Sequence, residues 1–401
     1  MTLRLFGACV AMLAWASPTL ASPLAPDDVV RAALAHDPSY RAALADVVAA
    51  RGALRAATFL RENPTLSADF SLTSDLASGA FAQPISLTGE GLAARSAAAA
   101  QLEAARQTAR RAAFVTATDA RRALATAIAA ESRATIASQA FDQSTARRVA
   151  IEARVRAGDA SPLDGRLARL EEGQAAEVFV SARSEARAAR VALARFLPDA
   201  GTVELPGDPL LVAPEALGGG ARSDLRAAQR RVDAARATQV AARAAILPAL
   251  SVGAFVERDD GVTSVGPSIG LTVPLWKRNP AGIAAAERAS AIADAEASSL
   301  AAVTSAEQAG GTEALRAADG ALARIAVAPA EDGRAALDAI AEAQARGELD
   351  PATATLLRIE ILDAWTASVA LRLAVADARL TALLANEDAA LLPPELREMT
   401  P

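Results

Sequence analysis

The chain has 401 residues, a net charge of −6 and a sequence pI near 5.2, so it offers no basic surface for nucleic acid. Its single cysteine, Cys9, and single histidine, His36, argue against a thiolate metal centre or a tight transition-metal site. Hydrophobic residues make up 52% of the chain but aromatic residues only 3%. Alanine supplies much of that fraction, and because alanine is the best helix former, the composition predicts long, thin, closely packed helices.

The N-terminal residues 1–21 have the organisation of a secretory signal peptide. Arg4 precedes an apolar run at residues 5–16, which is too short to span a bilayer, and the small residues Thr19 and Ala21 fit cleavage after Ala21. Cleavage there would remove Cys9; acylation of Cys9, as in a lipoprotein, is the alternative. No later stretch has the length and apolar character of a transmembrane helix.

Residues 22–198 predict a first structural repeat. Ala-rich stretches with spaced arginines at 26–60 favour a short helix followed by a longer one. At residues 65–87 the hydrophobic period changes to two on either side of polar turn residues 74–79, which predicts a β-hairpin. Residues 92–157 contain no Gly or Pro and predict a helix about 100 Å long, with a return helix at 163–197.

Each half of the chain contains a turn with glycine, an acidic residue and proline. The first lies at residues 156–162 and the second at 345–351, and Gly158 and Gly347 are 189 positions apart. A helix that ends at glycine and restarts with proline in its first turn is an α-hairpin. The same hairpin twice, half a chain apart, predicts an internal duplication.

Residues 199–222 predict a Pro/Gly-rich connector, and residues 223–385 the second repeat. This repeat is expected to contain a helix up to residue 247, a β-hairpin at 249–275 with its turn at 258–263, and two helical stretches that flank the second turn. Glycines 310, 311, 320 and 333 and Pro329 are expected to interrupt the first of these stretches, with a kink or break near Pro329. Residues 386–401 are expected to form a frayed tail.

The predicted fold class is therefore mainly α with a small β part: long coiled-coil hairpins in two repeats and four strands per chain. The strands are long enough to cross a bilayer, but four strands cannot close a barrel and their edges would stay unpaired in lipid. Three copies would supply twelve strands, within the range of outer-membrane β-barrels. The alternative is a small soluble sheet beside the helices.

The order helix, β-hairpin, rod, turn and return helix, present twice, resembles the TolC family of outer-membrane efflux channels over nearly the whole mature chain. Three short segments support the resemblance: residues 63–66 (Asn-Pro-Thr-Leu), 83–89 (Gln-Pro-Ile-Ser-Leu-Thr-Gly) and 273–279 (Val-Pro-Leu-Trp-Lys-Arg-Asn). The Gln83-Pro84 segment, and Pro329 ahead of the second turn, are most similar to the CzcC-like branch that serves heavy-metal efflux.

This resemblance implies a homotrimer with a twelve-stranded transmembrane β-barrel in the outer membrane and a helical tunnel in the periplasm. It implies as partners outer-membrane lipid, a periplasmic adaptor protein and an inner-membrane RND-type pump, and metal cations as the substrate that passes through. In the family the hairpin tips meet the adaptor and form the aperture. Carried over to this chain, the tip residues are Arg156, Gly158, Asp159, Asp164, Arg346, Gly347, Glu348 and Asp350.

Three copies of the acidic tip residues would gather around one mouth. A ring of carboxylates favours cations and can be gated by ion pairs with arginine, for which Arg156 and Arg346 are candidates. Thr353 and Leu356 stand where well-known family members have acidic aperture residues, so the resemblance does not supply a second carboxylate constriction. Ordinary solvated turn residues are the alternative interpretation of these charges.

No catalytic motif, phosphate-binding loop or cofactor-binding motif is present, so we expect a passive conduit and not an enzyme. Two other functions remain open. A TolC-type channel could serve drugs or protein secretion, and would differ from a metal channel only in its partners. A soluble periplasmic coiled-coil scaffold or adaptor would share the long hairpins but would not need four amphipathic strands.

Overall fold

The computed structural model describes residues 24–57, 63–70, 77–85, 89–201, 203–246, 249–259, 261–272, 279–324 and 330–397. The predicted signal peptide, Trp276 and Pro329 lie outside the described residues. Long helices and one small antiparallel sheet make up the fold, so the predicted fold class, mainly α with a small β part, is confirmed.

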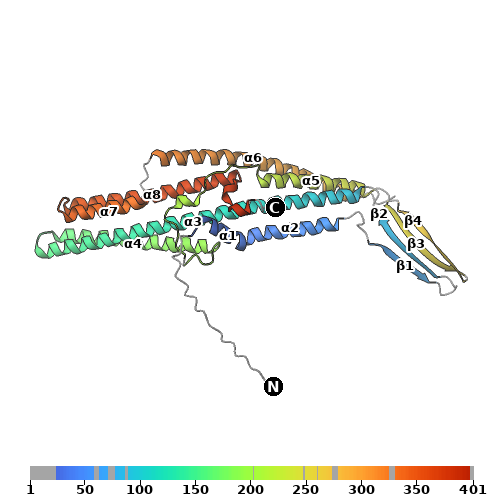
Figure 1. Ribbon diagram of the computed structural model, residues 1–401, viewed down its shortest axis with the longest axis horizontal. Coiled ribbons are helices and arrows are strands. Elements are labelled where there is room, and N and C mark those ends of the chain that lie inside the picture. The colour runs from blue at the N-terminus through green and yellow to red at the C-terminus, as the bar shows by residue number, and fades with distance from the viewer. Residues whose placement is uncertain are drawn as a thin grey trace, which may run out of the picture.

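Eight helices and four strands are described. The helices are α1 (Pro26–His36), α2 (Pro38–Ala56), α3 (Glu90–Ala157), α4 (Pro162–Ala194), α5 (Ser223–Ala244), α6 (Pro280–Arg324), α7 (Ala330–Ala345) and α8 (Pro351–Ala385). The strands are β1 (Thr65–Phe70), β2 (Ala77–Ile85), β3 (Ala249–Asp259) and β4 (Val262–Thr272), and three short 3₁₀ helices are η1 (Pro209–Val212), η2 (Ala389–Leu391) and η3 (Pro394–Leu396). The sheet lies at one end of an elongated molecule, and the α3–α4 and α7–α8 hairpins reach the other end (Figure 1).

The 68-residue helix α3 is the axis on which α1, α2, α4, α5 and α8 pack. Toward the hairpin end, α3 lies between α4 and α8, and α7 packs on the other side of α8. Toward the sheet, α3 lies between α2 and α5, and α6 packs on α5. One chain therefore forms an open row of helices, with α4 and α7 at its ends near the tips and α2 and α6 at its ends near the sheet.

The four strands form one antiparallel sheet in the order β1-β2-β3-β4, so the two hairpins join through β2 and β3. Leu66 pairs with Phe81, Phe81 with Ala254, and Val252 with Ile269, which places these mainly apolar side chains on one face. The other face carries mainly small or polar residues. Strand β2 begins at Ala77, within the segment expected as the first turn. The second turn is tighter than expected, because β3 and β4 pair as far as residues 259 and 262.

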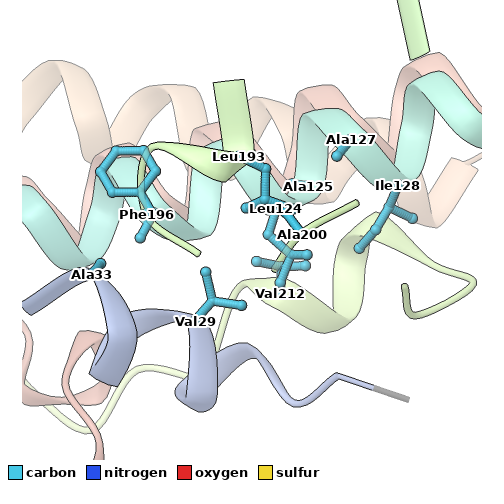
Figure 2. Packing of buried hydrophobic residues seen from close by; sticks show 11 residues of the cluster. Val29, Ala33, Leu124, Ala125, Ala127, Ile128, Leu193, Phe196, Ala200 and Val212 are labelled. Atoms are coloured by element: carbon cyan, nitrogen blue, oxygen red, sulfur yellow. The ribbon is translucent and has the colours of Figure 1, made fainter. Parts of the chain in front are cut away.

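A buried apolar cluster forms where α1, the connector and the C-terminal end of α4 pack on the middle of α3. Its residues are Val29, Ala33, Ala120, Leu124, Ala125, Ala127, Ile128, Leu193, Phe196, Ala200 and Val212 (Figure 2). Alanine predominates on α3, which lets the neighbouring backbones approach closely. This cluster lies between the sheet and the hairpin tips.

The guanidinium of Arg121 joins three distant segments beside this cluster. It donates to the carbonyl of Val212 at 3.0 Å, to the carbonyl of Leu391 at 3.2 Å and to the carboxylate of Asp27 at 2.5 Å. The Arg121 side chain is only 3% exposed. Burial lowers its pKa, whereas the charge of Asp27 and its hydrogen bond oppose that shift. Arg121 therefore holds α1, the connector and the C-terminal segment against one point of α3.

The C-terminal segment is folded onto the helices, so the expectation of a frayed tail is wrong for residues 386–397. Leu391 and Leu392 are buried in a second apolar cluster with α3 and α8. The Asp388 carboxylate accepts the backbone N–H groups of Leu217 and Gly218, at 3.1 and 2.9 Å. Burial of the two leucines stabilises the docked tail, and the hydrogen bonds of the Asp388 carboxylate offset the cost of removing that charge from water.

Helix α6 is continuous through glycines 310, 311 and 320, and α7 is continuous through Gly333, so the expected interruptions at these glycines are wrong. A Cβ atom added at Gly311 would lie 3.3 Å from the Cα atom of Ala382 on α8. This glycine lets two helices pack closely and does not end one. The break expected at Pro329 lies outside the described residues; α6 ends at Arg324 and α7 begins at Ala330.

Candidate functional site: the tips of the two helical hairpins

The two predicted tips lie at the same end of the molecule, opposite the sheet (Figure 1). The first tip joins α3 to α4 and contains Arg156, Gly158 and Asp159, and the second joins α7 to α8 and contains Arg346 to Asp350. The structure thus brings both sets of predicted tip residues to one end, although they are separated by almost half the sequence.

Both tips end their first helix in the same way. Gly158 adopts φ +84° and Gly347 φ +75°, a left-handed conformation that favours glycine. The N–H of Asp159 bonds to the carbonyl of Arg154 at 2.9 Å, and the N–H of Glu348 bonds to that of Ala343 at 2.9 Å. This is the Schellman arrangement, which satisfies carbonyl groups that a helix end otherwise leaves unpaired.

Both return helices begin with a side-chain cap. The hydroxyl residue precedes the aspartate in the first tip, and the aspartate precedes the hydroxyl residue in the second. In the first tip, Ser161 accepts the N–H of Asp164 at 3.2 Å, and the Asp164 carboxylate accepts the N–H of Ser161 at 2.9 Å. In the second tip, the Asp350 carboxylate accepts the N–H and the hydroxyl of Thr353, at 3.1 and 2.5 Å. Asp164 and Asp350, predicted as aperture residues, thus also stabilise the starts of α4 and α8.

The sequence alone did not lead us to identify Ser161 as the helix cap of α4 or Thr353 as the cap partner of Asp350. The signal was available: a hydroxyl residue and an aspartate three positions apart at a helix start is the pattern of a capping box. It occurs as Ser161…Asp164 and, in reverse, as Asp350…Thr353. Thr353 is therefore the cap partner of Asp350.

The remaining tip charges make local contacts. Arg346 pairs with Glu348 at 3.0 Å, with both side chains about 60% exposed. Arg156 donates to the backbone carbonyl of Glu152 at 3.4 Å. Because exposed ion pairs contribute about 0–1 kcal/mol each, these contacts shape the tips without locking them. Within the chain, Arg346 has a carboxylate partner in its own tip, and the contact of Arg156 is with its own helix.

Above the tips, the two helices of each hairpin are joined by contacts that differ between the first and the second hairpin. Arg148 of α3 pairs with Glu172 of α4 at 2.7 Å and with Glu152 at 3.0 Å. The hydrogen bond from Arg148 lowers the pKa of the Glu172 carboxyl. In the second hairpin, Trp365 of α8 lies against Gly333 of α7, where an added Cβ atom would be 2.7 Å from the Trp365 ring. The first hairpin is linked by these charges and by the stacked rings of Phe141 and Phe179, and the second by close apolar packing.

The described part of the chain offers neither a metal site nor a membrane-spanning helix. No group of three or more His, Cys, Asp and Glu side chains there is placed to hold a metal ion. None of the helices described is both long enough and apolar enough to span a membrane.

Replacing Ser161 by Ala tests the cap of the first tip. The variant loses the hydrogen bond to the Asp164 N–H, and we expect the start of α4 to be destabilised by about 1 kcal/mol. Hydrogen exchange of the first-turn amides of α4 should become faster. The matching change in the second hairpin, Thr353→Ala, keeps the Asp350 cap of the backbone and should affect the amides of α8 less. Equal exchange rates in wild type and Ser161→Ala would show that the cap contributes nothing.

The fold, with paired α-hairpins at one end and a four-stranded sheet at the other, is shared with solved structures of outer-membrane channels. The chain matches the outer membrane protein VceC from Vibrio cholerae with a TM-score of 0.70 and 19% identity, over 90% of this chain and 96% of that one. It matches the Campylobacter jejuni CmeC outer membrane channel with a TM-score of 0.68 and 14% identity, over 96% and 93% of the two chains. It matches CusC, solved in work on transmembrane channel formation, with a TM-score of 0.65 and 16% identity, over 91% and 92%. No protein-family profile and no curated protein sequence matches the chain.

Proposed function

We propose that this protein is an outer-membrane channel of a tripartite efflux system. It would conduct substrate passively from an inner-membrane pump, across the periplasm and the outer membrane, without catalysis. The observation that carries the proposal is the two-faced sheet with unpaired edges at the end of long helical rods. The shared fold with outer membrane channels supports it.

The apolar face of the sheet is exposed to an extent that is unusual for a protein in water. Leu66 is 83% exposed, Ile269 77% and Val265 75%. All three side chains belong to the same face, because the pairing register aligns their strands in phase. A contiguous apolar surface of this kind marks an interface, and a lipid bilayer is an interface of matching chemistry.

The edges of the sheet support a trimer. In one chain, β1 and β4 each pair on one side only, and an unpaired strand edge is costly in lipid. Pairing β4 of one copy with β1 of the next closes a ring, and three copies give about twelve strands. The open row of helices in each copy would join the row of the next copy in the same way, and the three rows would form a tunnel that continues the barrel. The tips would then lie in the periplasm, where an adaptor protein could contact them.

The substrate class is a further part of the proposal. The resemblance to the CzcC-like branch, and the acidic residues Asp159, Glu348 and Asp350 at the tips, favour metal cations supplied by an RND-type pump. The channel would pass these ions without ligating them. Drug efflux or protein secretion through the same conduit is the competing assignment.

The first experiment is membrane fractionation followed by gel electrophoresis of heated and unheated samples. We expect the mature protein in the outer-membrane fraction as a trimer that dissociates on heating, and ion conductance when the trimer is placed in a planar bilayer. A soluble periplasmic monomer would contradict the proposal and favour the coiled-coil scaffold. Deletion of the gene should raise sensitivity to divalent metal salts; sensitivity to drugs alone would contradict the metal assignment and leave the channel intact.

A further inference from the structure

Three arginines beside the sheet carry positive charge that the described part of the chain does not neutralise. Arg51 and Arg55 lie in the last two turns of α2, and Arg95 lies in the second turn of α3. All three residues are exposed, and no hydrogen bond or ion pair engages their side chains among the described residues. By contrast, Arg243 near the end of α5 pairs with Glu287 of α6 at 2.8 Å.

The three arginines lie at about the same height. Helix α2 runs toward the sheet and α3 runs away from it, and Val47 and Leu102 belong to one buried cluster between them (Figure 1). Arg55 is eight residues closer to the sheet than Val47, and Arg95 is seven residues closer than Leu102, which is about 10–12 Å of helix in each case. Arg51 lies about one turn further from the sheet.

These arginines face the outer side of the proposed tunnel. Arg95 begins a stripe of α3 that continues in steps of three or four residues to Arg121, where α1, the connector and the C-terminal segment pack. This second layer of chain would fill the tunnel from within, so it lies outside. Arg51 and Arg55 face the same way, because a right-handed helix that turns Val47 toward α3 carries residues 51 and 55 on that flank.

The arginines also lie next to the apolar part of the outer surface. Leu92, in the first turn of α3, is on the same side of the helix as Arg95 and is 71% exposed. In the proposed channel the apolar face of the sheet meets the lipid chains, which places Leu92 at their boundary and Arg95 about one turn beyond it, among the headgroups. The far end of the described strands has the opposite balance of charge, carried by Asp69, Glu257, Asp259 and Arg258.

We infer that Arg51, Arg55 and Arg95 bind the phosphate groups of anionic phospholipids in the leaflet that faces the periplasm. A planar guanidinium group can hold two phosphate oxygens at once, and a basic residue at an anionic leaflet strengthens binding about fivefold. This inference rests on the channel proposed above, in which three copies would surround the base of the barrel with three such sets. The resulting belt would fix the depth of the barrel in the membrane and favour anionic lipid around it.

Lipid binding measured by native mass spectrometry tests the inference. The trimer is purified in detergent and titrated with phosphatidylglycerol, which is anionic, or with phosphatidylethanolamine, which is zwitterionic. We expect the wild type to bind phosphatidylglycerol more tightly, and the combined variant Arg51→Gln, Arg55→Gln and Arg95→Gln to lose about fivefold in affinity for each arginine that contacts the lipid.

A matched control removes the same charge elsewhere. The combined variant Arg187→Gln, Arg226→Gln and Arg316→Gln changes three exposed arginines that lie more than about 25 Å of helix from the sheet end, and it should bind phosphatidylglycerol as the wild type does. Lysine at positions 51, 55 and 95 should keep the preference for the anionic lipid but bind it less tightly, because an ammonium group cannot hold two oxygens in the same plane.

Salt and the choice of lipid decide between the outcomes. Raising the salt from about 0.1 M to about 0.5 M should weaken phosphatidylglycerol binding to the wild type and leave the glutamine variant nearly unchanged. Equal binding of phosphatidylglycerol by wild type and glutamine variant, or equal binding of the two lipids by the wild type, would overturn the inference and leave the channel intact. A wild-type chain that forms no trimer in the membrane fraction would instead refute the proposed channel, and this inference with it.

Discussion

The variant Gly253→Ala is expected to lose the pairing between β2 and β3. A Cβ atom added at residue 253 would lie 1.9 Å from the backbone oxygen of Phe81 and 2.8 Å from the hydroxyl of Ser268. A backbone atom cannot turn aside as a flexible side chain can, so one of the two strands must move. Since overpacking at rigid sites costs about 1–3 kcal/mol and more when the backbone shifts, we expect a loss of more than about 3 kcal/mol.

Trypsin cleavage provides the readout for Gly253→Ala. Arg258 is the only lysine or arginine in the four described strands, and in the intact sheet its backbone pairs with Ala77 and Thr263. We expect rapid cleavage after Arg258 in the variant and protection in the wild type. Gly79→Ala is the matched control, because a Cβ atom there would meet Val256 at an ordinary 3.4 Å. Protection of Arg258 in Gly253→Ala would show that the sheet accommodates the methyl group.

The variant Arg121→Ala is expected to be destabilised by about 2–5 kcal/mol, because each buried acceptor that loses its donor costs about 1–3 kcal/mol. It leaves the carbonyls of Val212 and Leu391 without their donor and removes the buried partner of Asp27. Thermal unfolding should begin at a lower temperature, and trypsin should cleave early after Arg31 in the released helix α1.

The neighbouring residue supplies the control for Arg121. Arg122 is 37% exposed and pairs with Asp377 on the surface of α8, so Arg122→Ala should cost less than about 1 kcal/mol. Arg121→Lys should recover only part of the stability, because one ammonium group cannot reproduce a planar guanidinium that reaches three separate acceptors. Equal unfolding of Arg121→Ala and Arg122→Ala would refute the role assigned to Arg121.

Features that depend on local chemistry were predictable from the sequence. The uninterrupted stretch before Gly158 predicts α3, and the period-two alternation predicts the strands of both hairpins. Gly158 and Gly347 predict the two helix ends because each must adopt a positive φ. These signals lie within a few residues of the structure that they specify.

Features that depend on distant neighbours were not predictable in the same way. Gly311 has the same sequence signature as a helix-ending glycine, and only the position of Ala382 shows that it allows close packing. Leu391 and Leu392 follow a helix end, so their position favours a loose tail, whereas their burial depends on α3. The tip charges were assigned to gating, but the reciprocal bonds of Asp164 with Ser161 show that a carboxylate can already be engaged by its own helix start.

The docked C-terminal segment has a consequence for how the protein is made. Leu391 completes the set of partners around Arg121, and Asp388 holds the connector, so the middle of the molecule lacks these contacts until the segment after α8 has been made. Helix α1 is made well before the segment that covers it. A chain shortened after Ala385 would keep every long helix but expose the apolar surface beneath the missing segment.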